Sequence, residues 1–256
     1  MTRMRIMGLS LVAVFAMTAM VAASASAALP EFYECKKVTV KFSGVWNKGC
    51  LVEGKGNHEL KENEYEKVPG IGKAATKLFK GKGGAATLHT PAIGGEVKCK
   101  AFKDEGKLTS QKVESGVIST FTGCISLGKK CTTTGQTAGT IKTNKLTGAI
   151  GYISAAEHRV GVDLSPESGT ELAAFNCEGL SITVSGSVVG ELTPLFSMNK
   201  TSVNSFTVNG SGFQTYKSLE GQPEDVLESL VNGGGPFESG QQATATNKGE
   251  LLELRA

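Results

Sequence analysis

Short runs in which apolar and polar residues alternate mark the central part of the chain. In residues 181–188, Ile182, Val184 and Val188 share one parity, whereas serine and threonine occupy most of the other positions. A period of two places the two sets on opposite faces of a strand, one buried and one solvated. The same alternation recurs in two earlier runs, at Leu146, Ile150 and Tyr152 and at Val160, Val162 and Leu164. Residues 139–194 therefore predict a sheet around which the rest of the chain is organised.

Alternating runs elsewhere extend this pattern over most of the chain. Val38, Val40 and Phe42 alternate with lysine and threonine, and with the turn residues 47–49 they predict a hairpin over residues 28–50. Further strands are expected at residues 86–89, 95–102, 117–123 and 251–254, and a second hairpin joins residues 205–208 to 212–216. Residues 224–231 fit either a helix or a strand. About a dozen short strands with glycine-rich turns predict an all-β fold, an antiparallel β-sandwich or a barrel-like sheet.

Residues 53–85 interrupt the alternation. Lysine, glutamate and glycine dominate this segment, and its periodicity fades. The pattern leaves room for two short helices at most, over residues 59–68 and 73–79. We therefore expect a Lys/Gly-rich insertion near the N-terminus of the β-rich fold.

The first residues have the composition of an export signal. Arg3 and Arg5 precede an apolar run over residues 6–23, and Ala25-Ser26-Ala27 matches the small-x-small pattern of a cleavage site. The run is long enough for a membrane anchor, but no basic stop-transfer cluster follows it. We expect a signal peptide over residues 1–27 and a single secreted domain over residues 28–256, without a transmembrane segment. Within that domain, residues 28–85 form a candidate cysteine-linked subdomain.

Six cysteines follow the expected cleavage site, which in an exported chain indicates three disulfides. They are Cys35, Cys50, Cys99, Cys124, Cys131 and Cys177. Six cysteines allow 15 pairings. Proximity in the sequence favours Cys35–Cys50 and Cys124–Cys131, which leaves Cys99–Cys177. A zinc site is not expected, because the chain has no C-x-x-C and no histidine pair at ligand spacing, and no cofactor is expected.

The charge is divided unevenly along the chain. Residues 28–150 hold 20 lysines and arginines against 11 acidic residues, a net charge of +9, whereas residues 151–256 hold 5 against 13, a net charge of −8. This split fits either solvated faces of differing composition or a basic face that meets an acidic polymer. The best candidates for contacting an anionic cell-wall polymer or glycan lie close together in the sequence: Lys73, Lys77, Lys80 and Lys82.

A nucleic-acid-binding motif competes for the same segment. Residues 68–75 (VPGIGKAA) look like the hairpin of a helix-hairpin-helix motif, in which backbone N–H groups hold a phosphate. However, the preceding residues 59–66 are acidic and lack an apolar stripe, and Pro-Gly-x-Gly is common in ordinary turns. A surface nucleic-acid binder acting through residues 68–82 therefore stays an alternative.

Enzyme motifs are incomplete. His58-Glu59 begins an H-E-x-x-H pattern, but Glu62 stands where the second histidine is needed, and no G-x-S-x-G is present. His158 and Asp163 are the closest base–carboxylate pair, yet they have opposite parity along a predicted strand. A secreted glycan hydrolase stays an alternative function, because paired carboxylates can come from distant positions in the sequence. Glu157, Glu171 and Glu191 lie near predicted strand ends. We assign no catalytic residue.

Several short motifs resemble those of a group of secreted, cysteine-containing, β-rich proteins of actinobacteria. The resemblance spans most of residues 28–256, and its motifs are structural glycines, cysteines and buried aliphatics. They include Tyr65-Glu66 before Pro69-Gly70, Phe121-Thr122-Gly123-Cys124, Gly186-Ser187-Val188-Val189-Gly190 and Leu252-Glu253-Leu254-Arg255-Ala256. The resemblance implies an exported bacterial protein and supplies no catalytic residues. We expect a cell-envelope or extracellular protein with a binding or structural role.

Overall fold

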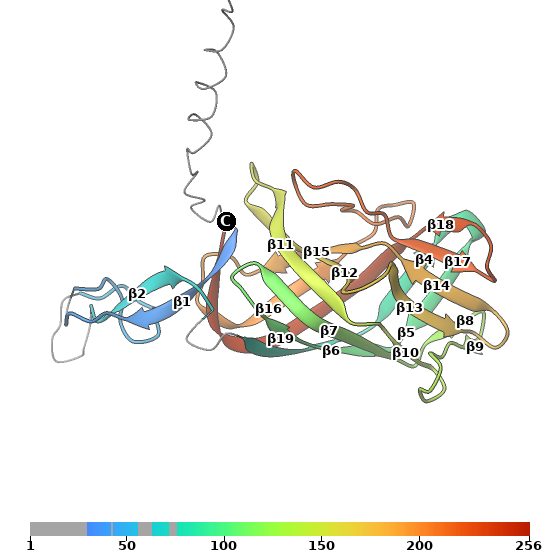
Figure 1. The fold of residues 1–256 in the computed structure, drawn as a ribbon, viewed down its shortest axis with the longest axis horizontal. Helices are drawn as coiled ribbons and strands as arrows, with labels where there is room; N and C mark the ends of the chain where they lie inside the picture. Colours follow the sequence, from blue (N-terminus) through green and yellow to red (C-terminus); the bar gives the residue numbers. More distant parts are fainter. Residues whose placement is uncertain (1–29, 42, 56–62, 72–75) are drawn as a thin grey trace, which may run out of the picture.

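Eight antiparallel strands close into a barrel in the computed structural model, which describes residues 30–41, 43–55, 63–71 and 76–256 (Figure 1). Around the barrel the strands follow the order β16-β15-β12-β11-β7-β6-β3-β19, and β19 pairs back with β16. Their bounds are β3 (Lys77–Gly83), β6 (Ala101–Leu108), β7 (Val113–Thr122), β11 (Leu146–Ser154), β12 (Arg159–Pro166), β15 (Val188–Thr193), β16 (Asn199–Phe206) and β19 (Gly240–Arg255). The prediction of an antiparallel, barrel-like, disulfide-linked all-β fold is confirmed.

Alternation along each strand separates the barrel interior from its surface. On β12, Val160 and Val162 are fully buried, as the period-two pattern predicts. On β6, Phe102 and Leu108 are buried, whereas Lys103 and Lys107 are exposed. An eight-stranded barrel has an interior just wide enough for side chains or for one small ligand.

One end of the barrel continues into a two-layered region, at the right of Figure 1. One layer extends the barrel sheet through β4 (Ala86–Thr90), β5 (Gly95–Cys99), β8 (Ile125–Ser126) and β9 (Lys129–Lys130), with a 3-10 turn at Pro91–Ile93 between β4 and β5. The other is a separate sheet of β13 (Glu171–Asn176), β14 (Ser181–Ser185), β17 (Glu228–Val231) and β18 (Pro236–Glu238). The short β10 (Thr140–Lys142) pairs with β7. Val97, Phe175 and Val184 belong to the same core cluster as the barrel residues, so the two regions share one core.

A small lobe projects from the opposite end of the barrel (Figure 1). It contains β1 (Glu31–Lys37) and β2 (Tyr65–Pro69), and β1 also pairs with the end of β19. Lys67 on β2 forms a buried ion pair with Glu253 on β19. The Lys67 ammonium also lies 3.8 Å from the centre of the Trp46 ring. These contacts fasten the lobe to the barrel.

The predicted hairpin over residues 28–50 is wrong. The partners of β1 are β2 and β19, and Val40 beyond its end is 66% exposed. The two predicted helices are also wrong where the structure describes them, because Tyr65–Pro69 and Lys77–Gly83 are strands. β2 pairs with β1, and β3 pairs with β6 and β19, so strand pairing satisfies their backbone groups and overrides a weak local helix preference.

The downstream elements follow the prediction more closely. The last predicted strand is part of β19, and residues 224–231 contain the strand β17. Between β16 and β17, an isolated β-bridge between Val208 and Gln214 stands in place of the predicted hairpin. The Asn209 side chain accepts a hydrogen bond from the Ser211 backbone at this turn. No helix in the described residues is long and apolar enough to cross a membrane.

All six cysteines form disulfides, as predicted, but two of the three predicted pairs are wrong. Cys35–Cys50 is confirmed, whereas the other bonds join Cys99 to Cys124 and Cys131 to Cys177. Cys124 and Cys131 flank the short β8–β9 hairpin, and each bonds outward to a different partner strand. Thr132 and Asn176 exchange backbone hydrogen bonds of 2.8 and 3.0 Å, which places Cys131 beside Cys177.

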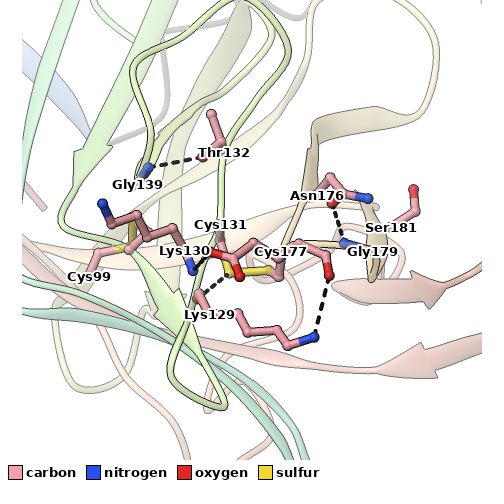
Figure 2. Close-up of a disulfide and its surroundings, with 12 residues drawn as sticks. Cys99, Lys129, Lys130, Cys131, Thr132, Gly139, Asn176, Cys177, Gly179 and Ser181 are labelled. Atoms are coloured by element: carbon pink, nitrogen blue, oxygen red, sulfur yellow. Dashed lines mark hydrogen bonds between the residues drawn. A yellow bond between two sulfur atoms is a disulfide. The ribbon is translucent and has the colours of Figure 1, made fainter.

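The Cys131–Cys177 bond ties the barrel sheet to the second sheet (Figure 2). Around it, the Lys130 backbone N–H donates to the Glu178 carboxylate, and the Lys129 ammonium donates to the Glu178 carbonyl oxygen. Three disulfides are consistent with an extracellular protein, because such bonds persist in oxidising compartments.

Candidate functional site

Exposed lysines gather on the outer face of the barrel over three neighbouring strands. β3, β6 and β19 lie side by side, and their outward positions carry the lysines. We call this set the basic face: Lys80, Lys82, Lys103, Lys107 and Lys248. Each alternates with residues that point into the barrel, so the strand period itself directs these side chains to solvent.

The register places like charges directly opposite one another. Lys80 faces Lys248 across the β3–β19 pair, and Lys82 faces Lys103 across the β3–β6 pair. Directly opposed like charges destabilise a sheet. At a separation of about 6 Å in water, each pair repels by about 0.7 kcal/mol. The basic face therefore concentrates positive charge, and the repulsion between its lysines lowers the stability of the free protein.

Few carboxylates offset this charge. Glu105 lies opposite Lys80 on β6, and among the described residues no carboxylate lies within 4.0 Å of any lysine of the basic face. Lys77, at the start of β3, differs because its ammonium lies 3.9 Å from Glu250. Five lysines and one glutamate give the face a net charge of +4.

The same strands line an open depression of about 910 Å³ on the barrel surface. Leu78 and Ile118 form apolar parts of its lining, and Leu78 is 75% exposed. Thr120 and Thr246 add hydroxyl groups in the row of Lys82 and Lys103. The site therefore offers ammonium groups, hydroxyls and an apolar contact to an extended ligand.

The four lysines predicted from the sequence have different locations. Lys80 and Lys82 belong to the basic face, Lys77 pairs with Glu250, and Lys73 lies outside the described residues. The sequence prediction missed Lys103, Lys107 and Lys248, because they come from distant segments. Lys103 and Lys107 alternate with buried residues of β6, and this alternation could have identified them in the sequence as surface lysines of a strand.

Two of the residues considered for hydrolysis share one partner, and the others have different surroundings. Glu191 and Glu157 both contact Arg159, at 2.6 and 3.7 Å, on the barrel surface. Glu171 accepts a hydrogen bond of 3.1 Å from the Asn144 side chain. The His158 ring packs edge-on against Phe196, whereas Asp163 is half-buried on β12. The structure therefore brings Glu157 and Glu191 to the same guanidinium, whereas Glu171, His158 and Asp163 do not join them there.

The helix-hairpin-helix prediction is wrong in its second helix. Residues 77–83, which that helix would need, form β3. Lys80 and Lys82 are thus presented by a sheet rather than by a helix start. In the described part of the chain, no group of three or more histidine, cysteine, aspartate or glutamate residues is arranged to hold a metal ion.

Two carboxyl groups lie inside the barrel. Burial raises the pKa of Asp104 to about 6, against a smaller opposing effect of its hydrogen bond with Ser119. Burial also raises the pKa of Glu114 to about 7, and the nearby Asp104 charge adds to this. Both groups line an interior cavity of about 110 Å³, which is too small for a glycan chain.

Comparisons with protein-family models, with curated proteins and with solved structures gave no match. Inference of function therefore depends on the geometry of the barrel and its surface. The structure defines a disulfide-linked, antiparallel β-barrel protein with a basic sheet face and a mostly apolar interior that contains a few polar groups.

Proposed function

We propose that this is an exported, non-enzymatic binding protein of the cell envelope, whose basic face contacts an anionic polymer such as a wall phosphate polymer. The observation that carries the proposal is the two pairs of opposed lysines, Lys80 with Lys248 and Lys82 with Lys103, without ion-pair partners among the described residues. A bound phosphate relieves the repulsion in each pair, so the polymer stabilises an arrangement that is unfavourable in its absence.

The spacing of the lysines suits a repeating anion. Lys80 and Lys82 lie two residues apart on one strand, about 6.6 Å along it, and neighbouring strands are about 4.8 Å apart. Lysine acts as a flexible point charge rather than a rigid fork. We therefore expect recognition by charge density along the polymer, with little preference for the groups between its phosphates.

Export is the second part of the proposal. It is supported by the signal-like residues 1–27 and by the three disulfides, which suit an oxidising compartment. A wall phosphate polymer is an abundant polyanion outside a bacterial cytoplasm. Nucleic acid offers similar charge, so the experiment must separate the two.

Co-sedimentation with purified cell wall tests the proposal. The mature protein should sediment with wall that retains its phosphate polymer, and should stay in solution with wall from which that polymer was extracted. The variant changes all four opposed lysines, Lys80, Lys82, Lys103 and Lys248, to serine. It should lose most of the binding without a change in its circular dichroism.

A matched control removes the same charge elsewhere. Lys36, Lys41, Lys129 and Lys130 are exposed in the lobe and at β9, and their change to serine should leave most of the binding intact. Equal retention of both variants, or equal binding to extracted wall, contradicts the proposal. Tighter binding to single-stranded DNA than to wall would assign the face to nucleic acid instead.

A further inference from the structure

The barrel interior combines an apolar wall with a few polar groups. Its cavity of about 110 Å³ lies among Phe79, Phe102, Phe121 and Phe206. A second cavity of about 60 Å³, toward the N-terminal lobe, shares Phe79, Glu114 and Asn247 with the first. Small binding sites commonly pair such apolar walls with a few placed polar groups.

Three buried oxygens in this interior have no hydrogen-bond partner. They are one Oδ1 atom each of Asp104, Asn204 and Asn247, and all three residues line the larger cavity. Asn204 is 6% exposed. All three atoms are hydrogen-bond acceptors, and a buried acceptor without a donor costs about 1–3 kcal/mol. These three oxygens therefore lack donors.

Glycines keep the space in front of these oxygens open. A Cβ atom on Gly190 of β15 would lie 2.1 Å from Oδ1 of Asn204. A Cβ atom on Gly81 of β3 would lie 2.1 Å from Oδ1 of Asn247 and 3.2 Å from Oδ2 of Asp104. The Asn247 amide and the Asp104 carboxyl thus lie close together in front of Gly81 on β3. Any side chain at position 81 would occupy this space.

We propose that the barrel interior binds a small primary amine, whose ammonium group donates to Asp104 and Asn247 and whose apolar part packs on the phenylalanines. An ammonium supplies donors and no acceptor, which complements these two unpartnered acceptors beside Gly81. No lysine, arginine or histidine lines the larger cavity in the described part of the chain. An apolar cavity of about 150 Å³ takes up benzene, which has six non-hydrogen atoms, so about four or five non-hydrogen atoms fit in about 110 Å³ here.

The carboxyl groups couple amine binding at this site to the release of protons. Asp104 faces Ser119 and Glu114 on β7 and Asn247 on β19, while Glu250 and Lys200 lie farther out along the second cavity. Burial holds a fraction of Asp104 and Glu114 protonated near pH 6.5. An ammonium favours the charged carboxylates, so the complex should release protons when it forms near this pH. This inference concerns the interior and is independent of the proposed polymer contact.

Isothermal titration calorimetry of the full mature protein with n-butylamine tests the site. The neutral isostere n-butanol is the matched ligand, and we expect the amine to bind at least ten times more tightly. Asp104→Asn should weaken amine binding at least tenfold. Asp163→Asn changes a partly buried carboxyl that does not line this cavity, and it should leave the affinity within twofold.

Wild-type protein alone also decides the question if the Asp104 variant does not fold. Titrations at pH 6.5 in two buffers of different ionisation enthalpy should show proton release, which should vanish near pH 9. Failure of millimolar butylamine to bind, equal binding of butanol, or binding without proton release at pH 6.5 would each overturn the inference. An amine affinity unchanged in folded Asp104→Asn would overturn it as well.

Discussion

Replacing Asp104 with asparagine tests whether the barrel interior disfavours a charged carboxyl. Burial raises the pKa of Asp104 from 3.8 to about 6 in the folded protein. The folded chain therefore binds this proton more tightly than the unfolded chain does. The contribution of Asp104 to the free energy of unfolding is fully present below about pH 4 and is lost as the pH rises through about 6.

The size of the effect follows from the shift. Each pH unit between the folded and unfolded pKa corresponds to 1.36 kcal/mol, so about two units correspond to roughly 3 kcal/mol. Wild type should lose this amount between pH 4 and pH 8, whereas Asp104→Asn has no such proton to lose. Relative to wild type, the variant should gain about 3 kcal/mol between the two pH values, and any fixed change in packing energy cancels in that comparison.

Urea unfolding followed by circular dichroism, with the disulfides intact, measures this difference. Glu105→Gln is the matched control, because Glu105 is the next residue on β6 and its side chain is exposed on the outer face. Its unfolding free energy should follow the wild-type dependence on pH. Parallel pH profiles for wild type and Asp104→Asn would show that the interior solvates this carboxyl and would refute the reasoning.

Three further predictions address the surface, the bridges and export. Neutralising a net charge of about four should give log K against log salt a slope near −3, so affinity for wall polymer should fall about 50-fold between 50 and 200 mM salt; sedimentation at a series of salt concentrations measures it, and a flat profile contradicts a charge-driven contact. Changing Cys131 and Cys177 together to serine opens a loop of 46 residues and should lower the free energy of unfolding by about 4 kcal/mol. Urea titrations measure this loss, and an unchanged midpoint would mean that the disulfide does not constrain the unfolded chain. Intact-mass measurement of protein from the culture medium or envelope should find a mature chain beginning at Ala28, and a species that retains Met1 would exclude cleavage.

The sequence predicted best those strands whose apolar residues point inward. Val160, Val162 and Leu164 alternate with polar residues or glycine on β12, and they occupy the core as expected. On β3 the pattern is weak, because Phe79 and Gly81 face the interior whereas Leu78 is exposed. Alternation of hydrophobicity does not identify such a strand, since the inward position 81 has no side chain and an apolar side chain points outward. The interior needs glycine there to admit Asn247 and Asp104.

The candidate sites depended on pairings that the sequence does not contain. Lys82 and Lys103 become neighbours through the β3–β6 register, and Lys248 joins them from the last strand. Proximity along the chain selected Lys77, which instead lies near Glu250. The same assumption paired Cys124 with Cys131, although their partners differ: Cys99 lies on β5 of the barrel sheet, and Cys177 directly follows β13 of the second sheet.

The position of β19 has a consequence for how the chain reaches its native state. This strand of 16 residues pairs with β16 and β3 to close the barrel, and it also pairs with β1 and β4. Until residues 240–255 are available, β3 and β16 each present an open edge, and the lobe has no strand to dock on. Folding therefore depends on pairing residues 31–34 with residues 252–255, and contacts so far apart in the sequence make folding slow.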